Sequence, residues 1–139
     1  MGYNAGMTHT QRTLAMLRKQ GWTAEVVERF VPAPHLPGGG HRKDYLGIID
    51  IIALAGPFTF GVQSCGEAFS EHAHKILESD GALAWLESPH RGLVLVGWRK
   101  IAAYRKDGTR ASRDRIAPRV QWFRLIDGKV QAMPEQDEL

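Results

Sequence analysis

The sequence has a single cysteine and no long apolar run, and both shortages limit what the protein can be. One cysteine, Cys65, cannot form an intrachain disulfide, so stability must come from a hydrophobic core. No stretch of about eighteen apolar residues is present, so no membrane span is expected. Residues 1–10 lack the charged head and apolar centre of a secretory signal. We therefore expect a cytoplasmic protein without a membrane partner.

The chain length fits one domain. Its 139 residues are 43% hydrophobic, which is enough for one core and too little for two. We see no internal repeat and no low-complexity segment. Residues 1–7 are expected to be a loose leader, and the acidic residues 134–139 a frayed tail. The sequence thus predicts a single domain over residues 1–139.

Apolar spacing and turn residues predict a mixed α/β order. The near-continuous apolar run 45–54 is expected to be a central strand, buried on both faces and paired as a hairpin with the next strand. Residues 82–87 extend the second helix or form a short one. A first helix is predicted to run to residue 20 from a cap at Thr8 or Thr10, and a second over residues 67–79. A mobile loop is predicted at residues 32–43. The predicted strands are 22–31, 45–54, 58–65, 93–98, 119–126 and 129–132. This order predicts an α/β domain with a mixed sheet and helices packed on it.

Basic residues are concentrated in one region of the chain, and aromatic residues lie among them. Half of the 18 Lys and Arg residues are Arg99, Lys100, Arg105, Lys106, Arg110, Arg113, Arg115, Arg119 and Arg124. The aromatic residues are Trp98, Tyr104, Trp122 and Phe123. Basic side chains neutralise phosphates and aromatic faces stack on unpaired bases, so this segment predicts nucleic-acid binding. The alternative is a solvated loop between strands whose aromatic residues are core.

Asp50 is the most informative position because it lies in a run of isoleucines. An ionised carboxylate there costs several kcal/mol unless a cation compensates its charge. Hard divalent cations prefer carboxylate oxygens, so a metal ion is one compensation. The alternative is a structural Asp that pairs with an Arg or accepts from backbone amides. On the next strand Gln63 and Cys65 share one face, and hairpin pairing brings Gln63 near Asp50. This arrangement is typical of a metal-dependent phosphodiesterase.

Residues 50–53 (DIIA) and 61–65 (GVQSC) resemble the core of the PD-(D/E)xK nucleases, and most closely that of the small archaeal and phage Holliday junction resolvases. The helix 11–20, with Gly21 and Trp22 after it, also fits their opening helix. The resemblance covers about residues 8–98. It implies a restriction-endonuclease-like mixed sheet flanked by helices, Mg²⁺ or Mn²⁺ as cofactor, and DNA, including branched DNA, as substrate. Junction resolution implies a homodimer, because two strands must be cut symmetrically.

Two positions depart from the motif that this resemblance implies. Asp50 matches the metal-binding Asp, whereas Gln63 stands in place of the second acid and Cys65 in place of the lysine. Gln63 can offer the metal only a neutral carbonyl oxygen. Relatives in the superfamily carry Gln at the acid position and the lysine on the next helix. Lys75 and His72 are therefore candidates for the missing base or phosphate contact; the alternatives are a solvated lysine and a core histidine.

The opening helix has no acid, so another carboxylate must complete the proposed metal site. Glu25 and Glu28 are the nearest candidates, and only one can serve because residues three apart on a strand point to opposite faces. Asp44, just before the central strand, is a further candidate ligand. The adjacent Arg42 and Lys43 are candidate phosphate contacts.

Other patterns are weak. Cys65 with His72 and His74 matches no strong zinc spacing or thiol-catalyst signature, and residues 38–40 are not followed by the Lys-Ser/Thr of a phosphate loop. The sequence therefore predicts a divalent-metal-dependent DNA endonuclease of the PD-(D/E)xK type. The alternatives are a catalytically decayed nucleic-acid-binding module and a partner-binding protein that uses no nucleic acid.

Overall fold

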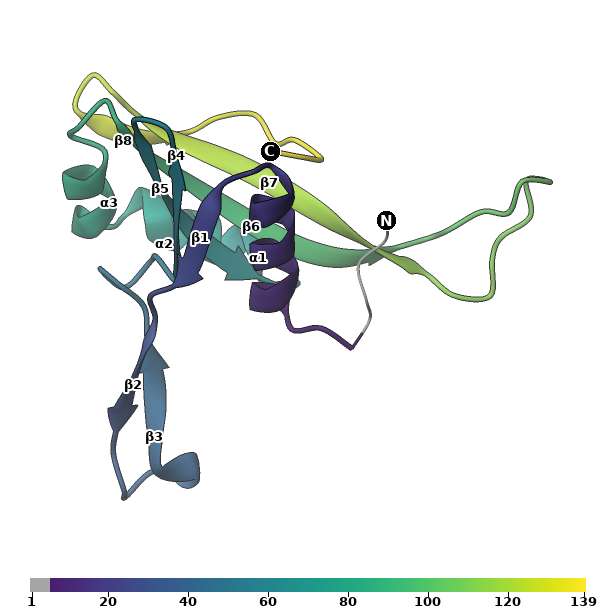
Figure 1. Ribbon diagram of the computed structural model, residues 1–139, viewed down its shortest axis with the longest axis horizontal. Coiled ribbons are helices and arrows are strands. Elements are labelled where there is room, and N and C mark those ends of the chain that lie inside the picture. Colours follow the sequence, from purple (N-terminus) through teal and green to yellow (C-terminus); the bar gives the residue numbers. More distant parts are fainter. Residues whose placement is uncertain (1–5) are drawn as a thin grey trace.

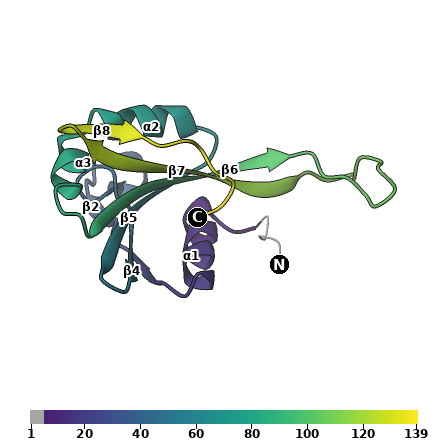
Figure 2. The same cartoon turned by 90° about the horizontal axis from the view of Figure 1, so that it is seen from above.

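A mixed β-sheet of six strands forms the centre of the protein (Figures 1 and 2). The computed structural model describes residues 6–139. In spatial order the strands are β1 (Thr23–Val26), β4 (Ile51–Ala55), β5 (Phe58–Cys65), β6 (Arg91–Ile101), β7 (Arg115–Ile126) and β8 (Lys129–Ala132). Only β5 and β6 run parallel, and the chain between them forms the crossover. The predicted α/β domain with a mixed sheet flanked by helices is confirmed.

Helices cover both faces of this sheet. Helix α1 (His9–Lys19) packs on one face, and α2 (Phe69–Leu77) and α3 (Asp80–Trp85) pack on the other, as Figure 2 shows for α1 and α2. A capping box between Thr8 and Gln11 begins α1. Residues 93–98 of the central strand β6 are buried on both faces because each face meets a helix, whereas Leu54 on β4, predicted to be buried, is 50% exposed. The buried core residues accordingly form two clusters, one on each side of the sheet.

Two hairpins project from the domain (Figure 1). Strands β2 (Arg29–Pro32) and β3 (Gly40–Lys43), joined through the short 3₁₀ turn η1 (Pro37–Gly39), form a separate two-stranded sheet. We call residues 29–43 the ribbon. The second hairpin consists of the outer parts of β6 and β7 and the loop between them. We call residues 99–115 the projection.

The structure corrects three predicted elements at the start of the chain. The single strand 22–31 is wrong: after β1, the Val27 N–H donates to the Asp50 carbonyl at 2.9 Å, and the chain then leaves the main sheet. The loop 32–43 is wrong in part, because Gly40–Lys43 is a strand. The strand 45–54 begins only at Ile51; its first half is a turn that places two isoleucines, Ile48 and Ile49, in the core.

The predicted hairpin of β4 and β5 is confirmed, and the strands of the basic region are longer than predicted. The expected frayed tail is instead held against β7. Val120 and Gln136 exchange two backbone hydrogen bonds of 2.8 Å, and Arg119 makes a two-point ion pair with Glu135. The first five residues of the expected leader lie outside the described residues. No helix within residues 6–139 combines the length and apolarity needed to cross a lipid bilayer.

A buried hydroxyl network fixes α1 to the sheet. Thr13 Oγ1 accepts from Trp98 Nε1 at 2.9 Å, lies 2.7 Å from Ser64 Oγ, and donates to the His9 carbonyl at 3.0 Å. The Thr13 side chain is fully buried, so these bonds are not shared with bulk water. One hydroxyl thus connects α1 with both β5 and β6.

We predict that Thr13→Val lowers the free energy of unfolding by about 1–3 kcal/mol, because the substitution removes the buried acceptor of the Trp98 indole. Urea unfolding measures the change. Thr10→Val, in the first turn of the same helix, is the control for the cost of a β-branched apolar residue in α1. Equal stability of the two variants would contradict the role given to the Thr13 hydroxyl.

Candidate metal centre

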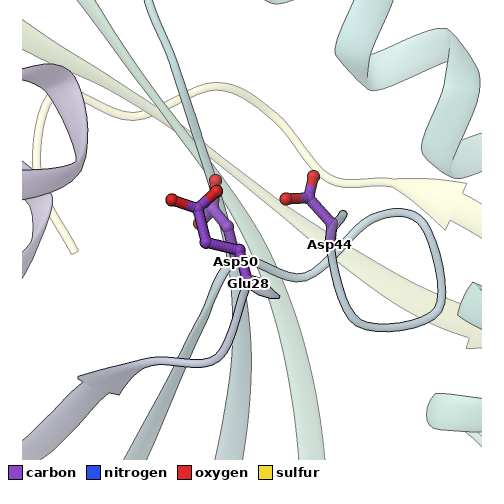
Figure 3. Close-up of side chains that lie close together, drawn as sticks. All are labelled: Glu28, Asp44 and Asp50. Carbon is purple, nitrogen blue, oxygen red and sulfur yellow. The ribbon is translucent and has the colours of Figure 1, made fainter. Parts of the chain in front are cut away.

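Three carboxylates meet where the ribbon joins the sheet (Figure 3). One oxygen from each of Glu28, Asp44 and Asp50 lies within 4.8 Å of the others. Glu28 lies just before the first ribbon strand, Asp44 directly follows the second, and Asp50 directly precedes β4. The ribbon leaves the sheet after Glu28 and returns to it before Asp50. It therefore brings Asp44 and Asp50, which are 16 and 22 positions from Glu28 in the sequence, close to Glu28.

Asp50 is fixed by its own backbone. Its N–H donates to the Val62 carbonyl on β5 at 3.0 Å, and its carbonyl accepts from Val27 at 2.9 Å. The residue therefore continues the sheet pairing on both sides, although β4 proper begins one residue later. Only 4% of Asp50 is exposed. This pairing holds the carboxylate at a set position at the sheet margin.

Two donors from β5 hold one oxygen of the Asp50 carboxylate. Oδ2 accepts from the Ser64 N–H at 3.1 Å and from Gln63 Nε2 at 3.2 Å. The same Gln63 nitrogen donates to Asp44 Oδ2 at 3.1 Å. In the described part of the chain, Asp50 Oδ1 and Gln63 Oε1 are buried and have no hydrogen-bond partner. Buried polar atoms are usually paired, so these two oxygens point to a ligand.

The electrostatics of the cluster also favour a cation. The pKa of Asp50 is raised from 3.8 to about 7, chiefly by burial; the charges of Asp44 and Glu28 add to this rise, and the hydrogen bonds from Ser64 and Gln63 oppose it. The basic side chain at the cluster is Arg42, which pairs with Glu28 at 3.2 Å. Carboxylate oxygens that converge in a partly buried site are the ligands that Mg²⁺, Mn²⁺ and Ca²⁺ prefer. Chemically, the arrangement can bind a hard divalent cation.

The structure brings together four of the candidate site residues from the sequence: Asp50, Gln63, Asp44 and Glu28. Glu25 is separate from them; it is exposed on β1 opposite Ile52. Only one of the two glutamates therefore joins the cluster, and the reason is the end of β1 between them. Gln63 was expected to offer its oxygen, but its nitrogen faces the carboxylates, because an N–H donor is attracted to two anionic oxygens.

The candidate replacements for the motif lysine lie outside the cluster. Lys75 is exposed on α2. His72, on the same helix, is half-buried, and its Nδ1 is buried without a hydrogen-bond partner among residues 6–139. Cys65 points into the core beside Phe69, and burial raises the pKa of its thiol to about 11. A neutral core thiol cannot perform the role of an ammonium group.

The basic residues singled out in the sequence fall into three groups, apart from Arg124, which is exposed on β7. Arg42 and Lys43 are exposed on the second ribbon strand, next to the cluster. Seven basic and only two acidic residues occupy the projection. The basic residues of the projection are Arg99, Lys100, Arg105, Lys106, Arg110, Arg113 and Arg115. Arg119 is structural, because its guanidinium lies over the Phe69 ring at 4.1 Å and pairs with Glu135. The predicted nucleic-acid-binding residues are therefore exposed on two hairpins.

Sequence reasoning missed two features of the site. The Ser64 N–H, a backbone donor to Asp50, gives no side-chain signal in the sequence. The pairing of the ribbon was also missed, because residues 29–31 were assigned to the main-sheet strand 22–31 and the prolines and glycines of residues 32–43 predicted a loop.

No protein-family model matches this chain, and the comparisons with curated proteins and with solved structures found no match either. The interpretation of the cluster therefore depends on its own geometry and chemistry.

We predict that metal-free wild-type protein loses stability as the pH rises from about 4 to about 7 because of Asp50. Its folded-state pKa of about 7 exceeds the value of 3.8 for an unperturbed Asp, so the folded state holds a proton that the unfolded chain releases. Asp50→Asn does not titrate. In EDTA at about pH 8 it should be more stable than the wild type by up to about 4 kcal/mol, from about 1.36 kcal/mol per pKa unit.

Urea unfolding in EDTA at several pH values tests this dependence. The advantage of Asp50→Asn should shrink as the pH falls toward about 4. Glu87→Gln, an exposed substitution outside the cluster, should show no such trend. If Asp50→Asn were less stable than the wild type at about pH 8, the ionised Asp50 carboxylate would not destabilise the metal-free protein as predicted.

Proposed function

We propose that the protein is a divalent-metal-dependent DNA endonuclease of the PD-(D/E)xK type. One observation carries the proposal: Asp50, which is 4% exposed and grouped with two further carboxylates, has an oxygen with no hydrogen-bond partner within residues 6–139. An acidic cluster alone is common on proteins. A buried carboxylate oxygen without a partner inside such a cluster is not, because it costs free energy in the absence of a ligand.

The order of the elements supports the nuclease proposal. With the ribbon left aside, helix α1 is followed by the antiparallel strands β1, β4 and β5, then by α2 and α3, and then by β6 parallel to β5. A mixed sheet of this kind, with a helix on each face, is what a restriction-endonuclease-like domain requires. The cluster lies at the start of β4 and near the end of β5, where the resemblance puts the motif.

The residues of the cluster fit Mg²⁺ or Mn²⁺. Asp50, Asp44 and Glu28 would hold the ion, and the Gln63 amide, rotated by half a turn, would offer its Oε1. Glu28 and Asp44 thereby supply the negative charge that Gln63 lacks as the second motif residue. When bound, such an ion polarises a water molecule and stabilises the charge of a phosphodiester in hydrolysis.

The chain's own residues perform the remaining tasks. The Ser64 N–H holds Oδ2 of Asp50 in either orientation of the Gln63 amide, which leaves Oδ1 for a ligand. Arg42 and Lys43 would contact the phosphate beside the cluster. Lys75 or His72, on α2, would position water or a phosphate.

The projection would hold the DNA backbone through its basic side chains. Symmetric cutting of a branched substrate would need two copies of the site, and hence a homodimer.

A second candidate function is a nucleic-acid-binding module whose catalytic site has decayed. Two observations favour it. The Cys65 side chain is buried in the core, so the motif position offers no cation, and the Gln63 nitrogen rather than its oxygen faces the carboxylates. Metal-dependent cleavage separates the two functions, because the decayed module would bind DNA in a salt-dependent manner without cutting it.

We predict metal-dependent cleavage of labelled DNA by the wild-type protein in Mg²⁺ or Mn²⁺, with four-way junction, duplex and single-stranded substrates compared. Asp50→Asn should lower the rate by at least about 100-fold, or about 2.7 kcal/mol in activation free energy. Glu87→Gln should cut as the wild type does. Tight binding without cleavage would favour the decayed module. The absence of both binding and cleavage would contradict both functions.

We also predict opposite effects of Gln63→Glu with and without metal. In EDTA the variant should be less stable, because a fourth carboxylate replaces a donor to two others. In Mn²⁺ it should gain more stability than the wild type, by about 1.4 kcal/mol for each tenfold gain in affinity. Thermal unfolding with and without Mn²⁺ measures both effects. A Mn²⁺-induced rise no larger than that of the wild type would argue against Gln63 as a ligand position.

A further inference from the structure

One face of the ribbon leads outward from the carboxylate cluster. Glu28 immediately precedes β2, which carries Phe30, and Asp44 immediately follows β3, which carries Arg42. Phe30 and Arg42 are direct partners in the register, and partners across an antiparallel pair lie on the same face. The Arg42–Glu28 ion pair of 3.2 Å agrees with this placement. From the cluster outward, this face thus carries carboxylates, then a guanidinium and a phenyl ring.

The Phe30 ring lies on the backbone of Gly40. A β-carbon at Gly40 would lie 2.6 Å from Phe30 Cζ, so the glycine leaves the space in which one side of the ring rests. Nevertheless, Phe30 is 54% exposed. One side of the ring is therefore supported by the ribbon, and much of the remainder is open to solvent. An aromatic ring held in this way is suited to stacking against another flat, apolar group.

Exposure of this ring is costly for an isolated ribbon. A two-stranded sheet is at best marginally stable in water, and the ribbon forms a sheet of its own. An exposed phenyl ring on such an element gains stability when a partner covers it. The chemistry of the partner is indicated by the charge beside the ring.

Arg42 provides that charge. Its side chain is 69% exposed, and the bond to Glu28 uses one of its five N–H donors. Lys43 and Arg29 form the next pair of the register, at the base of the ribbon. An anion next to an aromatic or apolar flat group would satisfy both Arg42 and Phe30. A nucleotide, with its phosphate and its base, combines these two groups in one unit.

We propose that this face of the ribbon is a subsite for an unpaired nucleotide beside the scissile phosphate. The proposal rests on the nuclease function above and names the kind of substrate that the site accepts. Arg42 donates to a backbone phosphate, and the base stacks on the open side of Phe30. Glu28 and Phe30 are two residues apart, or about 7 Å along a strand, a span that one nucleotide can cover.

The subsite selects unpaired bases because of how stacking works. A base within a continuous duplex already stacks on both neighbours and offers no free face, whereas an unpaired base does. The expected substrate is therefore single-stranded DNA, or DNA with an unpaired base at the cut, rather than a continuous duplex. Phe30 is a specificity-determining residue in this account, and it takes no part in metal binding.

Binding of a fluorescent oligonucleotide tests the subsite without cleavage. Anisotropy is measured in Ca²⁺ for a single strand and for its duplex, with wild-type protein, Phe30→Ala, Phe30→Trp and Phe58→Ala. Phe58 is the matched control, since it is an exposed Phe (43%) outside the ribbon. Phe30→Ala should weaken single-strand binding roughly 5- to 150-fold, the range that about 1–3 kcal/mol per stacked base represents.

The other samples isolate the stacking contribution. Phe30→Trp should bind the single strand like the wild type, Phe58→Ala should show no loss, and duplex binding should be unchanged by Phe30→Ala. Mn²⁺ binding, measured by calorimetry, should also be unchanged in Phe30→Ala, which shows that the cluster and the fold are intact.

Two results would overturn the subsite alone. One is single-strand binding by Phe30→Ala that equals binding by the wild type. The other is a concentration-dependent dimer of the wild type that Phe30→Ala dissociates, because the ring would then bind a second copy of the chain. Failure of the wild-type protein to bind Mn²⁺ or any DNA would instead remove the nuclease function on which the subsite rests.

Discussion

The carboxylate of Asp50 lies at the margin of the sheet, where burial and two neighbouring acids disfavour its charge. Much of the surrounding structure serves to hold it there. The backbone of Asp50 is paired with Val27 and Val62, and its Oδ2 accepts from Gln63 and Ser64. Burial of this ionised carboxylate costs free energy in the metal-free protein, and a bound cation would offset that cost.

The strands around Asp50 are themselves fixed by the packing of α1. The Thr13 hydroxyl lies 2.7 Å from the hydroxyl of Ser64, whose backbone N–H donates to Asp50. Burial of α1 and the position of the carboxylate are thus connected through one residue of β5. On the other side, the cluster acids Glu28 and Asp44 immediately flank the two ends of the ribbon. The position of the ribbon therefore sets the positions of two of the three carboxylates.

The core of the fold could be predicted from the sequence because periodicity reports burial. The hairpin of β4 and β5 followed from apolar runs, and it correctly brought Gln63 to Asp50. The position of Glu28 could be proposed but not distinguished from that of Glu25, because the break after β1 depends on a long-range backbone bond to Asp50. The ribbon was not predicted, since its strands pair only with each other and carry prolines and glycines that also mark loops. The proposed roles of Lys75 and His72 concern contacts with a bound substrate, which neither periodicity nor spacing reports.

The central claim is that Glu28, Asp44 and Asp50 form one divalent metal site. Anomalous diffraction from crystals of the wild-type protein grown with Mn²⁺ tests it most directly, with Asp50→Asn crystals as the control. The account predicts a strong anomalous peak between the three carboxylates of the wild-type protein and none at that position in the variant. A wild-type map with no peak there, or with manganese bound only elsewhere, would contradict it.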